Sequence, residues 1–168
     1  LSLETRITLK VHTSEMFAIA WTLDGTRIVT SSGDQTTRMT RVDGSGESVI
    51  LQDAGRVNMI VSSPMGERIA TTGSDGAARI WRLSDGQSLG VFRHPNVVIS
   101  ATFSPDGQRM STVALDGVVR VWNTNAPREP PQVLGQKGAF ADGVISPDGK
   151  YVASIAADRA VHIWDVTT

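Results

Sequence analysis

An eight-residue phrase recurs along this 168-residue chain and limits the possible folds more than any other feature. It reads SDGAARIW at 74–81, LDGVVRVW at 115–122, ADRAVHIW at 157–164 and, in a more divergent form, GDQTTRMT at 33–40. Its aspartates are separated by 41, 41 and 42 residues, and they are Asp34, Asp75, Asp116 and Asp158. Self-similarity at such a period is typical of repeat architectures, in which each unit packs on its neighbours.

Two further markers keep the same register. One is a turn glycine, spaced by 41, 41 and 42 residues, at Gly25, Gly66, Gly107 and Gly149. The other is a tryptophan slot, spaced by 42, 41 and 42 residues, held by Met39, Trp81, Trp122 and Trp164. The three markers together predict four units within one repeat domain, at about residues 5–42, 43–83, 84–124 and 125–166.

The local patterns within each unit indicate β-strands. VRVW and VHIW alternate apolar and polar residues with the period of a half-buried strand. SPDG, at 104–107 and 146–149, supplies the proline, aspartate and glycine that a tight turn needs. We therefore expect an all-β chain with outer strands at 6–10, 48–51, 87–92 and 131–134. Each is followed by three more, at 16–21, 27–32 and 36–41; 57–62, 68–73 and 77–82; 97–103, 109–114 and 118–123; and 140–145, 150–155 and 160–165.

Composition excludes several classes of function. The formal net charge of −1 gives no electrostatic basis for binding nucleic acid or an anionic membrane. The chain has no cysteine, and its apolar runs are too short to span a bilayer. Its three histidines lie in separate units, which disfavours a metal site. We expect a cytoplasmic protein without a cofactor or metal.

These residues resemble the WD-repeat (WD40) β-propeller family. The closing dipeptide of that family is complete at Trp164-Asp165 and varied at Trp81-Arg82 and Trp122-Asn123, and Met39-Thr40 lacks both letters. The resemblance implies a β-propeller of four WD40-type, four-stranded antiparallel blades. It covers essentially the whole chain.

The resemblance also implies a buried hydrogen-bond tetrad in each unit, made of a histidine, a Ser or Thr, the turn aspartate and the tryptophan. The matching residues are His12, Thr30 and Asp34; Thr71, Asp75 and Trp81; His94, Thr112, Asp116 and Trp122; and Ser154, Asp158 and Trp164. Asp53 and Gln136 occupy the histidine position in the second and fourth units. A structural role for His12 and His94 is therefore favoured over a catalytic triad.

Incomplete tetrads lead to local expectations. Asp53 facing Asp75 places like charges together, so that turn should be loosely bonded. The third unit should be the best ordered and the first the weakest. Arg79 and its counterparts lie two residues before the tryptophan slot, which predicts a solvated or cross-strand-paired outer face. His162 should be exposed or lie at a blade interface.

By resemblance, a loop face of the propeller binds protein partners. Its positions would be Glu15, Phe17, Arg56, Asn58, Val97, Ile99, Ala139 and Ala141, with Gly33, Ser74, Leu115 and Ala157. The residues near Leu115 are small or apolar. Two interpretations stay open: these side chains contact a partner, or they pack into the central channel.

Four units are few for a ring, since propellers have about four to eight blades. Two copies would close eight blades, with strand 6–10 of one copy completing the blade that ends at Trp164 of the other. We therefore favour a non-enzymatic interaction scaffold that forms a homodimer. The alternatives are a fragment of a longer WD40 array in a bacterial signalling protein, which 41–51 resembles, an engineered or purely structural repeat protein, and a small-ligand binder or enzyme using the channel.

Overall fold

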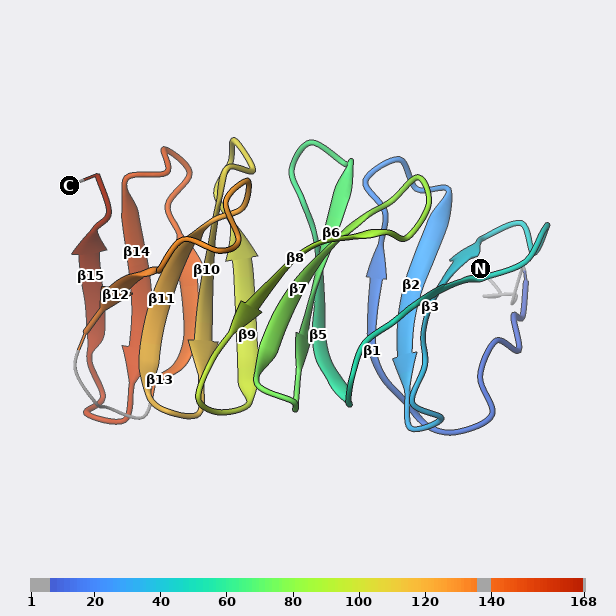
Figure 1. Cartoon of the computed structure of the whole chain (residues 1–168), viewed down its shortest axis with the longest axis horizontal. Helices are drawn as coiled ribbons and strands as arrows, with labels where there is room; N and C mark the ends of the chain where they lie inside the picture. The colour runs from blue at the N-terminus through green and yellow to red at the C-terminus, as the bar shows by residue number, and fades with distance from the viewer. Residues whose placement is uncertain (1–6, 136–139, 168) are drawn as a thin grey trace, which may run out of the picture.

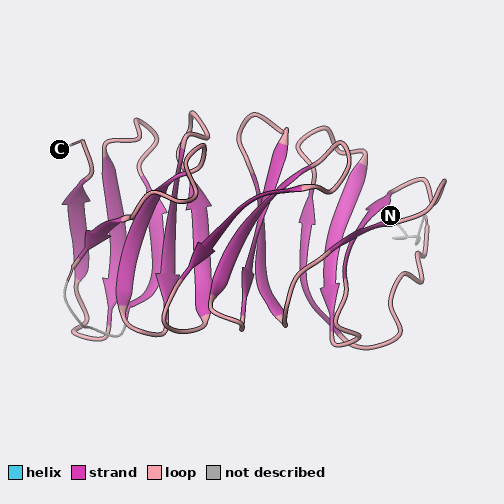
Figure 2. Cartoon of the chain, viewed as in Figure 1, coloured by secondary structure: helices cyan, strands magenta, loops and turns pink. Residues whose placement is uncertain are grey.

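A computed structural model describes residues 7–135 and 140–167, which form strands joined by turns (Figures 1 and 2). The strands of these ranges are β1 (Met16–Trp21), β2 (Arg27–Ser32), β3 (Thr37–Arg41), β4 (Val49–Leu51), β5 (Val57–Ser62), β6 (Arg68–Gly73), β7 (Ala77–Arg82), β8 (Ser88–Arg93), β9 (Val98–Phe103), β10 (Arg109–Ala114), β11 (Val118–Asn123), β12 (Gln132–Leu134), β13 (Phe140–Ile145), β14 (Tyr151–Ala156) and β15 (Val161–Asp165). Each lies at a predicted position.

The strands form four antiparallel meander sheets, which we call blades 1 to 4. Blade 1 is β1-β2-β3-β4, blade 2 is β5-β6-β7-β8, blade 3 is β9-β10-β11-β12 and blade 4 is β13-β14-β15. The blades follow one another in an open row, and the two chain termini lie at its opposite ends (Figure 1). The predicted all-β architecture of WD40-type blades is confirmed, whereas this chain by itself shows no closed ring.

The expected outer strand at 6–10 does not form over residues 7–10, and residue 6 lies outside the described residues. An outer strand needs the edge of another strand for its hydrogen bonds. The edge left unfilled is that of β15, which lies at the other end of the row (Figure 1). Within the described residues β15 therefore pairs only with β14.

The tryptophan slot of the first unit is Thr40, so its assignment to Met39 was wrong. Ile28 pairs with Thr40 across β2 and β3, as Ile69 pairs with Trp81 in blade 2. A shift of one residue moves a strand side chain to the opposite face of the sheet. Met39 accordingly pairs with Val29, is 1% exposed, and packs in the core between blades 1 and 2.

The turn between the first two strands of each blade forms as the SPDG pattern predicts. In blade 3 the Ser104 hydroxyl donates to Asp106 Oδ1 at 2.5 Å, and the Gln108 N–H donates to the same oxygen at 3.0 Å. Gly107 has φ of 67°, a left-handed value that favours glycine. These turns fix the register of the flanking strands.

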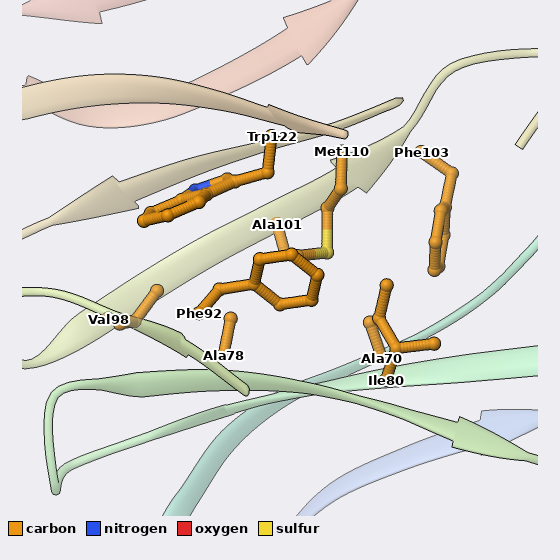
Figure 3. Packing of buried hydrophobic residues seen from close by; sticks show 9 residues of the cluster. All are labelled: Ala70, Ala78, Ile80, Phe92, Val98, Ala101, Phe103, Met110 and Trp122. Carbon is orange, nitrogen blue, oxygen red and sulfur yellow. The ribbon is translucent and has the colours of Figure 1, made fainter. Parts of the chain in front are cut away.

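Each core cluster lies between two neighbouring blades. We call the face that carries Thr30, Thr71, Thr112 and Ser154 the front of its blade, and the opposite face the rear. Figure 3 shows the rear of blade 2, with Ala70 and Ile80, packed against the front of blade 3, with Phe103 and Met110. Phe92 meets Trp122 edge to face at 5.4 Å. Every blade thus buries its front on the rear of the preceding one.

Arginines at the start of the second strands tie each blade to the next. The Nη1 atom of Arg27 donates to the carbonyl oxygen of Leu83 at 3.1 Å, and that of Arg109 donates to the carbonyl of Val166 at 2.6 Å. Arg68 at the middle junction donates to the Thr124 hydroxyl at 3.4 Å. Because these bonds cross between blades, they add directional contacts to the apolar junctions.

Candidate interaction site

The tetrad of blade 3 is a relay of hydrogen bonds centred on Thr112. The Trp122 indole N–H donates to Thr112 Oγ1 at 2.8 Å, and Thr112 Oγ1 lies 2.7 Å from His94 Nε2. His94 Nδ1 faces the Phe92 carbonyl at 3.1 Å, which can only accept, so Nδ1 carries the proton and Nε2 accepts from Thr112. Burial, together with the positive charge of Arg120, lowers the pKa of His94 to about 4, so the ring is neutral near pH 7.

The aspartate of this tetrad has a different partner from the expected one. Asp116 makes no hydrogen bond with His94; Arg120 binds its two oxygens at 3.1 and 2.6 Å. The Val118 N–H also donates to Asp116 at 3.1 Å. The arginine therefore takes the role that we had expected of the imidazole.

Blade 2 builds the same relay without a histidine. The Trp81 indole N–H donates to Thr71 Oγ1 at 2.9 Å, and the Thr71 hydroxyl donates to Asp53 Oδ1 at 3.0 Å. The Asp53 carboxylate thus accepts the proton that His94 Nε2 accepts in blade 3. This substitution keeps the indole and hydroxyl paired inside the sheet.

The expected looseness of the turn at Asp75 was wrong, because Arg79 joins the two aspartates. Arg79 is 6% exposed, lies 3.5 Å from Asp53 Oδ1 and binds both oxygens of Asp75. The Ala77 N–H adds a bond of 3.2 Å to Asp75. Burial still raises the pKa of Asp53, whose Oδ2 is buried without a hydrogen-bond partner. Arg79 and Arg120 are therefore ion-paired across their turns, and the solvated interpretation of them was wrong.

Blade 1 is the one in which histidine and aspartate meet. His12 Nδ1 lies 3.0 Å from Asp34 Oδ2, and His12 Nε2 lies 2.8 Å from Thr30 Oγ1. Hydrogen bonds from Thr36, and a further one from the Thr13 N–H, hold the pKa of Asp34 below its usual range. Thr40, in the tryptophan slot, bonds instead to Ser48 at 2.7 Å.

Blade 4 repeats the turn pair with a histidine in place of arginine. His162 Nε2 lies 2.9 Å from Asp158 Oδ2, and the imidazole stacks on Trp164 at 5.8 Å between ring centroids. The Trp164 N–H donates to Ser154 at 3.0 Å. Gln136 lies outside the described residues. In every blade these groups hold a turn to a strand, which is a structural role.

The loop face brings the predicted partner-binding positions together in pairs. The Gly33 N–H donates to the carbonyl of Glu15 at 2.8 Å, and the Ser74 and Arg56 positions form the same bond in blade 2 at 2.8 Å. In blade 3, Leu115 N–H donates to the Val97 carbonyl at 2.8 Å. Ala157 lies exposed in the matching turn of blade 4, whereas Ala139 and the side chain of Ala141 lie outside what the structure describes.

Three of these residues also cross a blade junction. The Arg56 guanidinium carbon lies 3.9 Å from the centre of the Phe17 ring, a cation–π contact between blades 2 and 1. Asn58 Nδ2 donates to the Val98 carbonyl at 3.1 Å, and Ile99 packs against the core between blades 3 and 4. Leu115 is 58% exposed, so in the open row it packs into no channel.

Two apolar surfaces at the ends of the row were missed by sequence reasoning. The front end face, on blade 1, exposes Ile19 by 65% and Trp21 by 59%. The rear end face, on blade 4, exposes apolar side chains by 47% to 71%, namely Val144, Ile155, Val161 and Ile163. A hollow of about 100 Å³ lies on the rear end face. The repeat register contained the signal, since these positions are core positions in the inner blades.

Meander sheets stacked front to rear define a propeller-type repeat protein. The family model described as "WD domain, G-beta repeat" matches residues 3–40, 48–82, 86–123 and 138–165, so the chain belongs to the WD40 repeat family. No curated protein matches the chain. WD40 domains typically mediate protein–protein interaction and are generally non-enzymatic.

The described residues hold no helix that is long and apolar enough to cross a membrane. In the same residues, no three side chains of the metal-binding types gather into a site.

Proposed function

We propose that this chain is a non-enzymatic assembly scaffold whose ends bind a second copy, so that two copies close an eight-bladed ring. The observation that carries the proposal is the pair of apolar end faces. A side chain such as Trp21 or Ile163 is more than half exposed here, although the matching positions at the inner junctions are covered by the next blade. Contiguous apolar patches of this kind mark interaction sites on soluble proteins.

The unfilled edge of β15 supports the same proposal. Blades 1 to 3 each receive an outer strand, β4, β8 or β12, from the segment that leads into the next blade. Residues 6–10 precede blade 1 in the same way and have no neighbouring edge in their own chain. In a two-copy ring they pair with β15 of the other copy, and both exposed edges are satisfied.

The geometry of a propeller favours eight blades over four. Closing four blades requires a rotation of about 90° from each blade to the next, whereas eight blades require about 45°. A rotation near 45° differs little from that of the usual WD40 ring, which has about seven blades. The inner junctions can therefore be repeated between copies with little change.

Multi-angle light scattering tests self-association directly. We expect a species of twice 18.0 kDa at micromolar concentration. A particle of 18.0 kDa at every concentration up to about 1 mM, where binding would be weaker than about 4 kcal/mol, would refute the proposal.

The loop face supplies the second half of the scaffold role, as the surface for other proteins. Leu115 is exposed there and is held rigidly, because its N–H is bonded to Val97. A Leu115→Asp variant should keep its fold and its mass and lose bands captured by the unchanged chain. Identical capture by both proteins would remove Leu115 from the partner surface.

A further inference from the structure

The inner junctions show which positions meet when one blade covers another. At the junction of blades 3 and 4, a Cβ atom added at Gly143 would lie 3.1 Å from Cγ2 of Val113. Gly143 lies on the front of blade 4 beside Ser154, and Val113 lies on the rear of blade 3 beside Val119. A front position on the innermost strand therefore faces a rear position on the second strand.

Strand pairing extends this contact to the ends of the row. Ile19 pairs with Thr30 as Gly143 pairs with Ser154, so Ile19 is the front position of blade 1. Ile155 pairs with Val161 as Val113 pairs with Val119, so Ile155 is the rear position of blade 4. Both residues lack the neighbour that their counterparts have at the inner junctions.

A second pair of positions gives a closer match. At the junction of blades 2 and 3, Phe103 packs in one cluster with Ala70 and Ile80 and is 7% exposed (Figure 3). Trp21 occupies the Phe103 position in blade 1, since it pairs with Ile28 as Phe103 pairs with Met110.

The surface that would receive this tryptophan has the same composition as the one that receives Phe103. Ala153 pairs with Ile163 in blade 4 as Ala70 pairs with Ile80 in blade 2. The rear end face thus repeats the alanine and the isoleucine on which Phe103 packs, and Ile163 is 71% exposed.

We infer that a second copy of this chain docks head to tail, with Trp21 of one copy packed on Ala153 and Ile163 of the other, and Ile19 against Ile155. The inference rests on the proposed self-association and specifies its contact. A head-to-tail contact uses two different surfaces, so it buries both end faces when the ring closes. Front-to-front pairing would instead leave the apolar rear end face of each copy in water.

Mixing two charge variants tests the head-to-tail contact. Trp21→Glu and Ile163→Glu should each be 18.0 kDa alone, because each removes one side of both junctions. An equimolar mixture keeps one unaltered junction and should recover a species of twice 18.0 kDa, with a weaker dissociation constant than the parent. Val133→Glu is the matched control, since Val133 is 58% exposed on β12, away from both end faces, and should leave the dimer intact.

Each outcome separates the inference from the proposal beneath it. Single variants that remain dimeric, or a mixture that stays monomeric while the parent is a dimer, would overturn the head-to-tail contact and leave self-association standing. A monomeric parent would overturn both. Ile19→Glu with Ile155→Glu provides a second pair if thermal unfolding shows that either first variant has lost its fold.

Discussion

Replacing Arg79 with methionine should destabilise the chain strongly, because this side chain neutralises two buried carboxylates. The Arg79 side chain is 8% exposed, that of Asp53 is 3% exposed and that of Asp75 is 17% exposed. Removing one partner of a buried ion pair costs about 3–5 kcal/mol, since the remaining charge stays out of water. We therefore expect Arg79→Met to lower the free energy of unfolding by about 4 kcal/mol at pH 7.

Arg120→Met is the matched control. Arg120 holds the same slot in blade 3 but faces only Asp116, whose side chain is 16% exposed. Its loss should cost about 1–3 kcal/mol, which is the penalty of one unsatisfied polar group. In the Arg79→Met background, Asp53→Asn should restore about 2 kcal/mol, because it removes the charge and keeps an acceptor for the Thr71 hydroxyl.

Urea denaturation followed by tryptophan fluorescence measures these differences. The argument fails if Arg79→Met costs no more than Arg120→Met, or if Asp53→Asn gives no recovery. Either result would mean that the two carboxylates of blade 2 are already solvated or already protonated at pH 7, so that the arginine contributes packing alone.

Other predictions concern single contacts. The neutral His94, with its pKa lowered from 6.5 to about 4, gives stability that is complete above pH 7 and is lost as the pH falls; unfolding measured at pH 7.5 and 5 should differ by about 2 kcal/mol, and by much less in His94→Gln. Arg109→Ala removes the bond to the Val166 carbonyl and should cost about 1–3 kcal/mol in urea denaturation, against no change for the exposed Arg128→Ala; equal effects would refute the interblade role. Thr71→Val leaves the indole N–H of blade 2 without its acceptor and should cost about 1–3 kcal/mol; an unchanged midpoint would contradict the relay.

The strands could be predicted from the sequence because their signals are local. Alternating residues such as those of 161–165 and turn sequences such as 104–107 each act within a few residues. The repeat then aligned weak copies with strong ones. The same alignment failed at Met39, since an apolar side chain looked like a substitute for tryptophan, and only the pairing of Ile28 with Thr40 resolved the face.

The site could be predicted less well, because its contacts join segments that no local pattern connects. The tetrad positions were found, but the role of Arg79 depends on Asp53, which lies 26 residues away and enters from the preceding segment. The spacing of four residues from Asp75 to Arg79, and from Asp116 to Arg120, was the available signal. The end faces were missed because front and rear positions differ only in which neighbour covers them.

Ring closure between copies can be tested most directly with a pair of engineered cysteines, since the chain has none of its own. Ile19→Cys and Ile155→Cys, placed in one chain, correspond to Gly143 and Val113, which meet at an inner junction. After mild oxidation we expect a covalent species of twice 18.0 kDa on a denaturing gel. Chains that remain at 18.0 kDa would contradict the account: free thiols would show that the end faces do not meet, and an internal disulfide would show that four blades close on themselves.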